Sequence, residues 1–510
     1  MNQTGELERV SPAEEKFERW RRRIGLLAGP VAALAVYFLS AGLPPEQRSL
    51  AAVLVLVIAF WVTEAIPIPA TALLGPALCI LLGVGEARDV FRGFANPVIF
   101  VFLGSFLLAR AMTVNQLDRR VALGILRSRL IGSSPARIRL AVGAAAALLS
   151  MWISNTASVA ILFPIVVGLS DALERLFARG GPALVRAGRS YVTGLMLMTA
   201  YAATVGGLAT TVGSPPNLIG LGMMDTMAGR RIPFFEWMLL GLPMSLALFA
   251  LLALLMRYLH PAPSQRLEGL DAALSEAGRG IAPWGRAQTY TMLAFFCAVV
   301  LWVLPGVVAL LKGTEDPIYQ LLSQRLPEGV VALLAASLLF LLPVSWSPPR
   351  GALAWREAVQ IDWGTILLFG GGLSLGGLMY STGLAERLAR GLLGAEGSIN
   401  LWVFTAAVTL FASLLTETTS NTASASMIIP VVIAVALAAG ISPLPPALGA
   451  TLGASLAFML PVATPPNAIV YGSGRIRILQ MVRAGVLYDL LGVGVVLLLL
   501  RILCPLLGLV

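Results

Sequence analysis

Charged residues are scarce in this sequence, and so are the residue types that build most enzyme and metal sites. Of its 510 residues, 12% are charged, three are cysteines and one, His260, is a histidine. Lys16 and Lys312 are its two lysines. A soluble domain carries about 25% charged residues, so the composition excludes a cytosolic enzyme, a disordered scaffold and a secreted disulfide-rich domain. The cysteines lie in apolar runs without metal-site spacing, and one histidine leaves little room for histidine-based catalysis.

Apolar residues are abundant instead, at 57% of the chain with a mean hydropathy of +0.85. The net charge of +10 comes from basic residues between apolar runs and not from a patch, which argues against nucleic-acid binding. A spanning helix needs about 20 mostly apolar residues, and about 11 segments qualify. We therefore predict an all-α polytopic membrane protein with spans at 24–41, 50–65, 67–85, 97–113, 191–225, 234–257, 287–311, 329–345, 363–382, 446–473 and 484–509.

Two further apolar stretches, 140–170 and 400–440, are broken by polar triplets at their centres, so each is predicted to form two half-length helices. The cluster Arg19–Arg23 before the first span indicates a cytoplasmic N-terminus. The loops at 119–139 and 175–189 are both rich in arginine and therefore both belong inside. Residues 140–170 must then enter the membrane and return, as a re-entrant hairpin.

By the same distribution of basic residues, both ends of 400–440 are expected outside. This stretch is therefore predicted to form a second hairpin that points the opposite way. It also predicts a multi-pass protein of the plasma (bacterial inner) membrane, with its C-terminus outside.

Two polar motifs occur twice, in the same order, in the two halves of the chain. Ser-Asn-Thr stands at 154–156 and again at 420–422. Ser-Pro-Pro-Asn at 214–217 is matched by Thr-Pro-Pro-Asn at 464–467. With the hairpins opposed, this duplication predicts an inverted repeat. Inverted repeats with helices broken near the midplane are typical of secondary transporters.

These motifs suit a site that holds an anion together with cations. Non-helical backbone persists in hydrocarbon only where it lines a protein cavity. Ser-Asn-Thr offers hydroxyls, an amide and helix N-terminal N–H groups, which favour an anion. Each proline pair breaks a spanning helix and frees carbonyl oxygens, which suit Na⁺. No Arg or Lys occurs at 140–174 or 391–474, so we expect neutral dipoles and bound cations, not an arginine clamp, to hold the anion.

One Ser-Asn-Thr motif alone is explained equally well by a helix cap, and one proline pair by a kink. Four breaks in matched pairs favour a shared site. Glu417 is the acid nearest a hairpin tip. It either tunes cation binding or faces away and bonds neighbouring backbone.

Together with the segment Trp-Val-Thr-Glu-Ala-Ile-Pro at 61–67, the paired motifs resemble those of the divalent-anion:sodium symporter family, which carries dicarboxylates, citrate or sulfate. The resemblance covers most of residues 24–510. It implies a homodimer in the lipid bilayer, with a scaffold domain and an elevator-type transport domain in each protomer. It also implies one Na⁺ site per repeat, with the divalent anion between the two hairpin tips.

The resemblance carries over to individual residues by motif. The first Na⁺ site would use Ser150, Ser154, Asn155 and the backbone of Gly213. The second would use Thr416, Thr419 (through its carbonyl), Asn421 and the backbone of Ala463. The anion would meet Ser154, Asn155, Thr156, Ser214, Ser420, Asn421, Thr422 and Thr464.

A division of the chain follows from the same resemblance. Residues 1–23 form a cytoplasmic segment, and the scaffold takes 24–113 and 234–382. The transport domain takes 114–233, with the hairpin 140–170 and the broken helix 191–225. It also takes 383–510, with the hairpin 400–440, the broken helix 446–473 and the last helix.

Sodium-coupled symport of a divalent anion is the expected function. A sodium-independent dicarboxylate exchanger would share the fold, and a passive anion channel would show no sodium requirement. An intramembrane enzyme is disfavoured, because no nucleophile–base pair is found. Dicarboxylate, tricarboxylate and sulfate all remain open as substrates.

Overall fold

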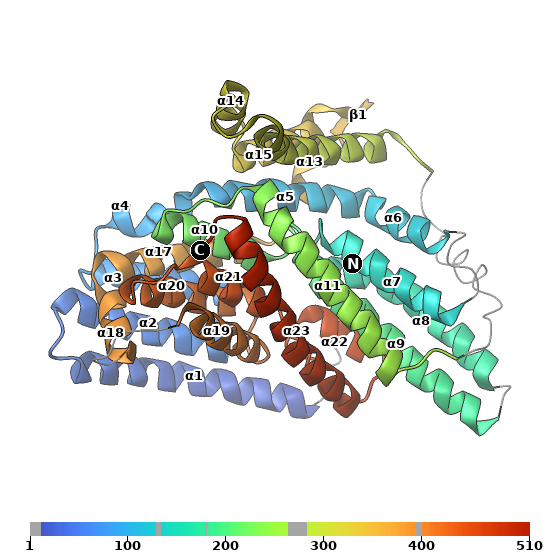
Figure 1. Cartoon of the computed structure of the whole chain (residues 1–510), viewed down its shortest axis with the longest axis horizontal. Coiled ribbons are helices and arrows are strands. Elements are labelled where there is room, and N and C mark those ends of the chain that lie inside the picture. The colour runs from blue at the N-terminus through green and yellow to red at the C-terminus, as the bar shows by residue number, and fades with distance from the viewer. Residues whose placement is uncertain (1–11, 129–133, 179–180, 264–282, 394–399) are drawn as a thin grey trace.

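The computed structural model describes residues 12–128, 134–178, 181–263, 283–393 and 400–510. These residues form a bundle of α-helices with one two-stranded antiparallel hairpin (Figure 1). Residues 1–11 of the predicted N-terminal segment, and 129–133 and 179–180 of the two basic loops, lie outside the described residues.

The first half of the chain contains α1 (Pro12–Leu39), α2 (Pro45–Thr63), α3 (Ile68–Leu81), α4 (Ala87–Val90), the 3-10 helix η1 (Phe91–Ala95), α5 (Pro97–Val114), α6 (Leu117–Leu126), α7 (Pro135–Ser150), α8 (Asn155–Ala178), α9 (Pro182–Gly206), α10 (Pro215–Ala228) and α11 (Phe234–Leu259). The second half contains α13 (Arg286–Lys312), α14 (Pro317–Arg325), α15 (Glu328–Leu341), β1 (Pro343–Trp346), β2 (Pro349–Gly351), α16 (Trp355–Ala358), α17 (Trp363–Ser381), α18 (Leu384–Leu393), α19 (Leu401–Thr416), α20 (Asn421–Ala438), α21 (Leu444–Gly453), α22 (Pro465–Tyr471) and α23 (Ile478–Leu506).

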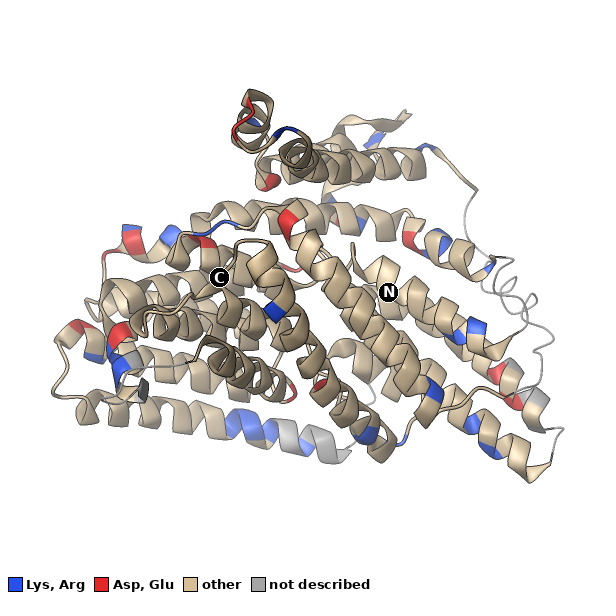
Figure 2. Ribbon diagram, in the orientation of Figure 1, with Lys and Arg blue, Asp and Glu red and all other residues tan. Residues whose placement is uncertain are grey.

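Every predicted span corresponds to a helix or to a pair of broken helices, so the prediction of a helical membrane protein is confirmed. Among the described residues, 8 helices are long and apolar enough to cross a membrane unaided. The remaining predicted spans are shorter helices, such as α3 and α15, or are broken, as at 191–225 and 446–473. Figure 2 shows charged residues mainly at helix ends and in loops, with few along the middles of the long helices.

The predicted breaks fall at the polar motifs. The stretch 140–170 becomes α7 and α8, joined by a turn at 151–154, and 400–440 becomes α19 and α20, joined by a turn at 417–420. The two long broken helices leave eight- and eleven-residue segments, 207–214 and 454–464, between α9 and α10 and between α21 and α22. Proline begins the helix after each segment, where its missing N–H costs no intrahelical bond.

Two short helices lie where the sequence suggested only loops. α6 occupies part of 119–139 and follows α5, while α18 follows α17 in the other repeat. Both have apolar residues on one face and charged residues on the other. A ten-residue helix is too short to span the bilayer, so a search for long apolar runs does not detect it.

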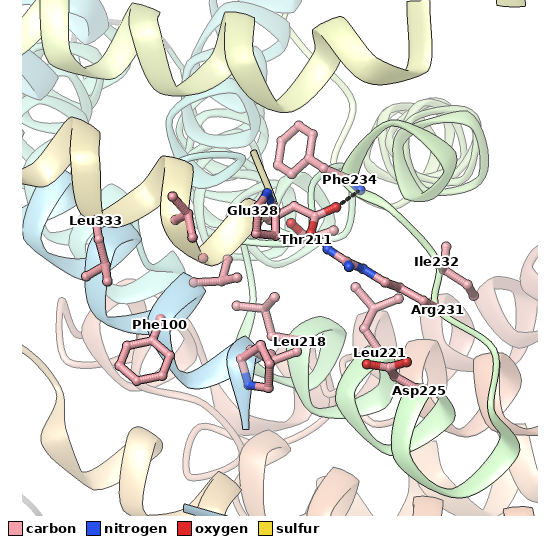
Figure 3. Close-up of a pocket in the computed structure, with 16 residues that line it drawn as sticks. Phe100, Thr211, Leu218, Leu221, Asp225, Arg231, Ile232, Phe234, Glu328 and Leu333 are labelled. Carbon is pink, nitrogen blue, oxygen red and sulfur yellow. Dashed lines mark hydrogen bonds and ion pairs between the residues drawn. The ribbon is translucent and has the colours of Figure 1, made fainter. Parts of the chain in front are cut away.

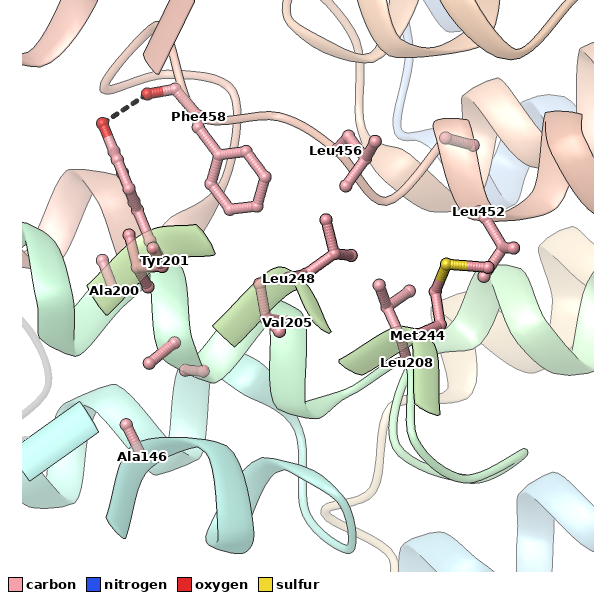
Figure 4. Packing of buried hydrophobic residues seen from close by; sticks show 14 of the residues in the cluster. Ala146, Ala200, Tyr201, Val205, Leu208, Met244, Leu248, Leu452, Leu456 and Phe458 are labelled. Atoms are coloured by element: carbon pink, nitrogen blue, oxygen red, sulfur yellow. Dashed lines mark hydrogen bonds between the residues drawn. The ribbon is translucent and has the colours of Figure 1, made fainter. Parts of the chain in front are cut away.

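Packing divides the bundle into groups of helices. α13, α15 and the β-hairpin lie along one edge in Figure 1, where α13 and α15 pack on α5 and β2 contacts α15. α1 lies along the opposite edge, beside α2. α11 packs against α9 and α23. In Figure 4, Met244 and Leu248 of α11 lie among Val205 of α9, Leu208 of the first broken segment and Leu456 of the second.

The single histidine directly follows α11 and is buried, with 6% of its surface exposed. Its carbonyl accepts a hydrogen bond from the Arg139 guanidinium, and its Nδ1 lies 3.1 Å from the Ser190 hydroxyl. Burial, together with the positive charge of Arg139, lowers the pKa of His260 to about 4. His260 is therefore neutral at physiological pH and joins α7, α9 and α11 as a structural clamp.

This clamp predicts a pH dependence of stability. The unfolded chain binds a proton at His260 near pH 6.5, whereas the folded protein binds it only near pH 4. Stability from this group is thus lost as the pH falls from about 6.5 towards 4. His260→Gln should flatten the fall of the apparent Tm between pH 7 and pH 5, measured in detergent. An unchanged slope in the variant would contradict this assignment.

Candidate functional site

One cavity of about 540 Å³ brings both copies of the repeated motifs together. The two hairpin tips and the two broken helices form one wall, and α5 with residues 360–365 forms the other. The residues predicted to meet the anion all line it: Ser154, Asn155, Thr156, Ser214, Ser420, Asn421, Thr422 and Thr464. Segments separated by more than half of the chain therefore form a single site.

The first hairpin tip carries a compact group of oxygen atoms. The Ser150 hydroxyl donates to Asn155 Oδ1 at 2.6 Å, and the Ser154 hydroxyl accepts from the Ala157 N–H at 3.2 Å and caps α8. A Cβ placed on Gly213 would lie 2.7 Å from the carbonyl oxygen of Gly207 and 2.9 Å from that of Ser150. A side chain larger than glycine would therefore crowd these carbonyls.

The second hairpin tip repeats the arrangement. The Thr416 hydroxyl lies 2.8 Å from Asn421 Oδ1, as Ser150 does from Asn155, and 2.9 Å from the Ala454 carbonyl oxygen. Ser420 caps α20 by accepting from the Ala423 N–H at 3.1 Å. The Thr419 side chain turns away and contacts the Ser424 hydroxyl, which leaves its carbonyl for the role the sequence assigned to it.

The asparagine of each proline motif holds the break beside it. Asn217 donates from Nδ2 to the carbonyls of Gly207 and Thr210, both at 2.8 Å. Asn467 donates to Ala457 at 3.0 Å and to Leu460 at 3.1 Å. Both asparagines are fully buried, and each Oδ1 accepts no hydrogen bond within the described residues. The matched geometry explains why each motif ends in asparagine, a role that sequence reasoning did not assign.

Glu417 supports the second break in a way that has no counterpart in the first repeat. Its carboxylate accepts the N–H groups of Phe458, Met459 and Leu460, at 2.7, 2.9 and 3.0 Å. The side chain is 4% exposed. The sequence left open whether Glu417 tunes cation binding or bonds neighbouring backbone. The structure shows the bonds to backbone. Met151 stands at the corresponding place in the first repeat.

Burial differs among the oxygens of the site. Ser150 and Thr416 are fully buried beneath the tips, whereas Ser154, Thr156 and Thr422 are exposed or half-exposed. Ser214 and Thr464, also predicted to meet the anion, are buried. Buried hydroxyl, amide and carbonyl oxygens without N–H donors around them suit a dehydrated alkali cation. Exposed hydroxyls at two helix N-termini suit an anion. The arrangement therefore allows cations at the buried oxygens beneath the hairpin tips and an anion at the tips, inside the cavity.

Sequence reasoning did not single out Arg110 of α5, which also lines this cavity. No arginine lies within the repeated motifs themselves, so this one comes from another helix. Its position inside the predicted span 97–113 could have marked Arg110 as a candidate, because intramembrane charges are costly and rarely lack a role.

A second cavity of about 440 Å³ lies between α5, α10 and α15. Figure 3 shows Arg231, in the loop after α10, paired with Glu328 at the start of α15. The other Glu328 oxygen accepts from the Phe234 N–H at 3.4 Å. Thr211, in the first broken segment, lines this cavity, so the segment lies between the two cavities.

Comparison with known proteins covers nearly the whole chain. A family profile described as the sodium:sulfate symporter transmembrane region matches residues 18–510. The sodium-dependent dicarboxylate transporter SdcS of Staphylococcus saprophyticus is 34% identical over 506 residues, which cover 96% of this chain and 93% of the relative. The SdcS of Staphylococcus aureus strain bovine RF122 is 34% identical over 486 residues, with 94% and 91% covered.

Two solved structures share the fold at low sequence identity. The Neisseria gonorrhoeae MtrF structure, described as one of a class of antimetabolite efflux pumps, aligns with a TM-score of 0.56 at 12% identity. The match covers 92% of this chain and 97% of MtrF. The Alcanivorax borkumensis YdaH transporter aligns at 0.50 and 15% identity, with 90% and 98% covered.

The contacts of Glu417 generate a mutational prediction. Glu417→Gln replaces one acceptor oxygen by an amide that opposes backbone N–H groups, and a buried donor left unpaired costs about 1–3 kcal/mol. We expect a lower Tm and a several-fold higher half-saturating Na⁺ concentration, because residues 454–464 flank the second candidate cation site. Thermal unfolding at graded Na⁺ measures both.

Met151→Gln is the matched control, since it places the same side chain at the corresponding tip position of the first repeat. Equal effects of the two substitutions on Na⁺ affinity would contradict a specific supporting role for Glu417.

Proposed function

The chain belongs to the sodium:sulfate symporter family of sodium-coupled divalent-anion transporters, and on that basis we propose that it imports a dicarboxylate together with Na⁺ by an elevator-type movement. The observation that carries this proposal is the single cavity lined by both Ser-Asn-Thr tips and both proline motifs.

The shape of the site favours a dicarboxylate. Two hairpin tips face one cavity, and each presents a helix N-terminus with hydroxyls, so two carboxylates can each meet one tip. The SdcS relatives are named as dicarboxylate transporters. Sulfate, which the family description names, has a single anionic centre and is the competitor to include in every assay.

Sodium is proposed to bind at both tips before the anion. The oxygens of Ser150, Asn155 and Gly213 would surround one ion, and those of Thr416, Asn421 and Ala463 the other. Ser154 and the Thr419 carbonyl complete the two predicted sets. A dianion brought alone to neutral dipoles would be poorly compensated, since a charge deep in the membrane costs several kcal/mol. Bound Na⁺ supplies positive charge, so each ligand should tighten the other.

The moving unit is proposed to contain both hairpins, both broken helices, α23 and also α11. This differs from the predicted scaffold limits of 234–382. Two hydrogen bonds support it: Trp237 Nε1 donates to the Leu208 carbonyl at 3.1 Å, and Tyr488 donates to the Leu248 carbonyl at 2.8 Å. Met244 and Leu248 of α11 also pack among residues of the broken helices in Figure 4. A helix that supports the first break directly would have to travel with it.

The structure is proposed to represent the state open to the cytoplasm. The fixed wall of the cavity consists of the last turns of α5 and the start of α17. Both lead towards segments that are expected inside, because of the arginines at 119–139 and at Arg350 and Arg356. The Arg231–Glu328 pair would then bridge the moving unit and the scaffold on the outer side.

A fixed scaffold is proposed to be anchored by a second copy of the chain. α13 carries a row of exposed apolar side chains, which includes Leu293, Phe296, Val300 and Leu310. Lipid or a partner's helix must cover such a surface. We propose a homodimer in the bacterial inner membrane, with a cytoplasmic N-terminus and an outer C-terminus.

Sodium coupling predicts a specific loss of function. Asn155→Ala and Asn421→Ala each remove one oxygen donor from one candidate cation site, and each should reduce succinate uptake at least tenfold or raise its Na⁺ requirement. Uptake is measured in proteoliposomes with sodium or choline outside, with sulfate and citrate as competitors. Wild-type uptake that is equally fast and equally concentrative in choline would instead support an exchanger.

The topology makes an independent prediction. In a background lacking the native cysteines, cysteines at positions 137 and 175 should both be labelled only from the cytoplasmic side. Cysteines at Asn400 and Ser442 should both be labelled only from outside. Labelling of the two ends of one hairpin from opposite sides would contradict the re-entrant arrangement.

A further inference from the structure

Arg110 is a charged side chain without a charged partner in the described part of the chain. Its Nε donates to the Glu357 carbonyl oxygen at 3.2 Å, and its Nη2 donates to the Gln360 side-chain oxygen. Both partners are neutral groups. The residue is half-buried and is the one basic residue among the described residues that line the motif cavity.

The nearby acids are engaged elsewhere. The Glu357 carboxylate accepts from Arg350 at 3.1 Å and from the Ala354 N–H at 2.9 Å. Asp362, which also lines the cavity, accepts the Thr365 N–H at 3.1 Å and the Thr365 hydroxyl at 2.5 Å, and so caps α17. Among the described residues Arg110 therefore forms no ion pair with either acid, although Asp362 lines the same cavity.

The motif wall presents the complementary chemistry. Hydroxyls and amides at the hairpin tips are neutral, and the cations that would compensate a dianion there must themselves leave for the cytoplasm. An anion whose Na⁺ ions have left needs another positive charge to remain in the cavity. A guanidinium forms two parallel hydrogen bonds with a carboxylate, which a lysine does not.

We propose that Arg110 is a second binding group for the substrate carboxylate, used only while the hairpin tips face the cytoplasm. This inference rests on the proposed dicarboxylate transport. Because Arg110 belongs to α5, which the proposed movement leaves in place, the tips carry the anion away from it in the other state. Arg110 would thus increase anion affinity at the cytoplasmic face and leave the outer face unchanged.

The sidedness of this effect makes it testable. Succinate transport is measured from the outer face in right-side-out vesicles and from the cytoplasmic face in inverted vesicles, at a sub-saturating Na⁺ concentration. Arg110→Gln keeps a hydrogen-bond donor and removes the charge. It should raise the half-saturating succinate concentration at the cytoplasmic face about tenfold, which corresponds to about 1.4 kcal/mol. The outer-face value should change less than twofold. Arg110→Lys keeps the charge without the two parallel hydrogen bonds and should restore only part of the loss.

Arg356→Gln is the matched control, because it removes an exposed arginine from the adjacent α16 that does not line the cavity. It should leave both faces unchanged. An equal change at both faces in Arg110→Gln, or no change at either, would overturn the proposal. Failure of the underlying function would show separately, as absence of sodium-dependent succinate transport in the wild-type vesicles.

Discussion

The constraint on which the structure depends is the need to satisfy backbone groups wherever a helix is broken inside the bilayer. Water is absent from hydrocarbon, so each freed N–H and C=O must find a partner in the protein. Asn217 and Asn467 each bind two carbonyls within the broken segment that precedes them, and Glu417 binds three N–H groups at once. The oxygens left without donors then become available to ligands.

The pairing of backbone groups at the breaks also bears on how a site with neutral motifs could bind a dianion. Buried oxygens beneath the tips suit cations, and the exposed hydroxyls above them suit the anion. On the proposed account, the charge that compensates the anion arrives and departs with Na⁺. Arg110 lies on the wall proposed to stay fixed, so its charge would be available in only one of the two states. Such a site would couple occupancy to movement, because the compensating charge is not fixed in the transport unit.

The sequence predicted the hairpins, the breaks and the residues that line the cavity, because these features are local and occur twice. The Ser-Asn-Thr and Pro-Pro-Asn motifs interrupt apolar runs at matched places, and position alone indicates their role. Contacts between distant segments leave no such pattern in the sequence. Tertiary packing alone places Arg110 at the cavity of the motifs and Trp237 of α11 against Leu208. The short helices α6 and α18 were missed because neither is long enough to give a span signal.

Equilibrium binding of succinate to the purified protein, measured over a range of Na⁺ concentrations, tests the central claim most directly. If Na⁺ builds the anion site, succinate affinity should rise steeply with Na⁺ and level off only when both cation sites are filled. Linkage requires Na⁺ affinity to rise by the same factor when succinate is present. Succinate affinity that stays constant from zero to saturating Na⁺ would contradict the account.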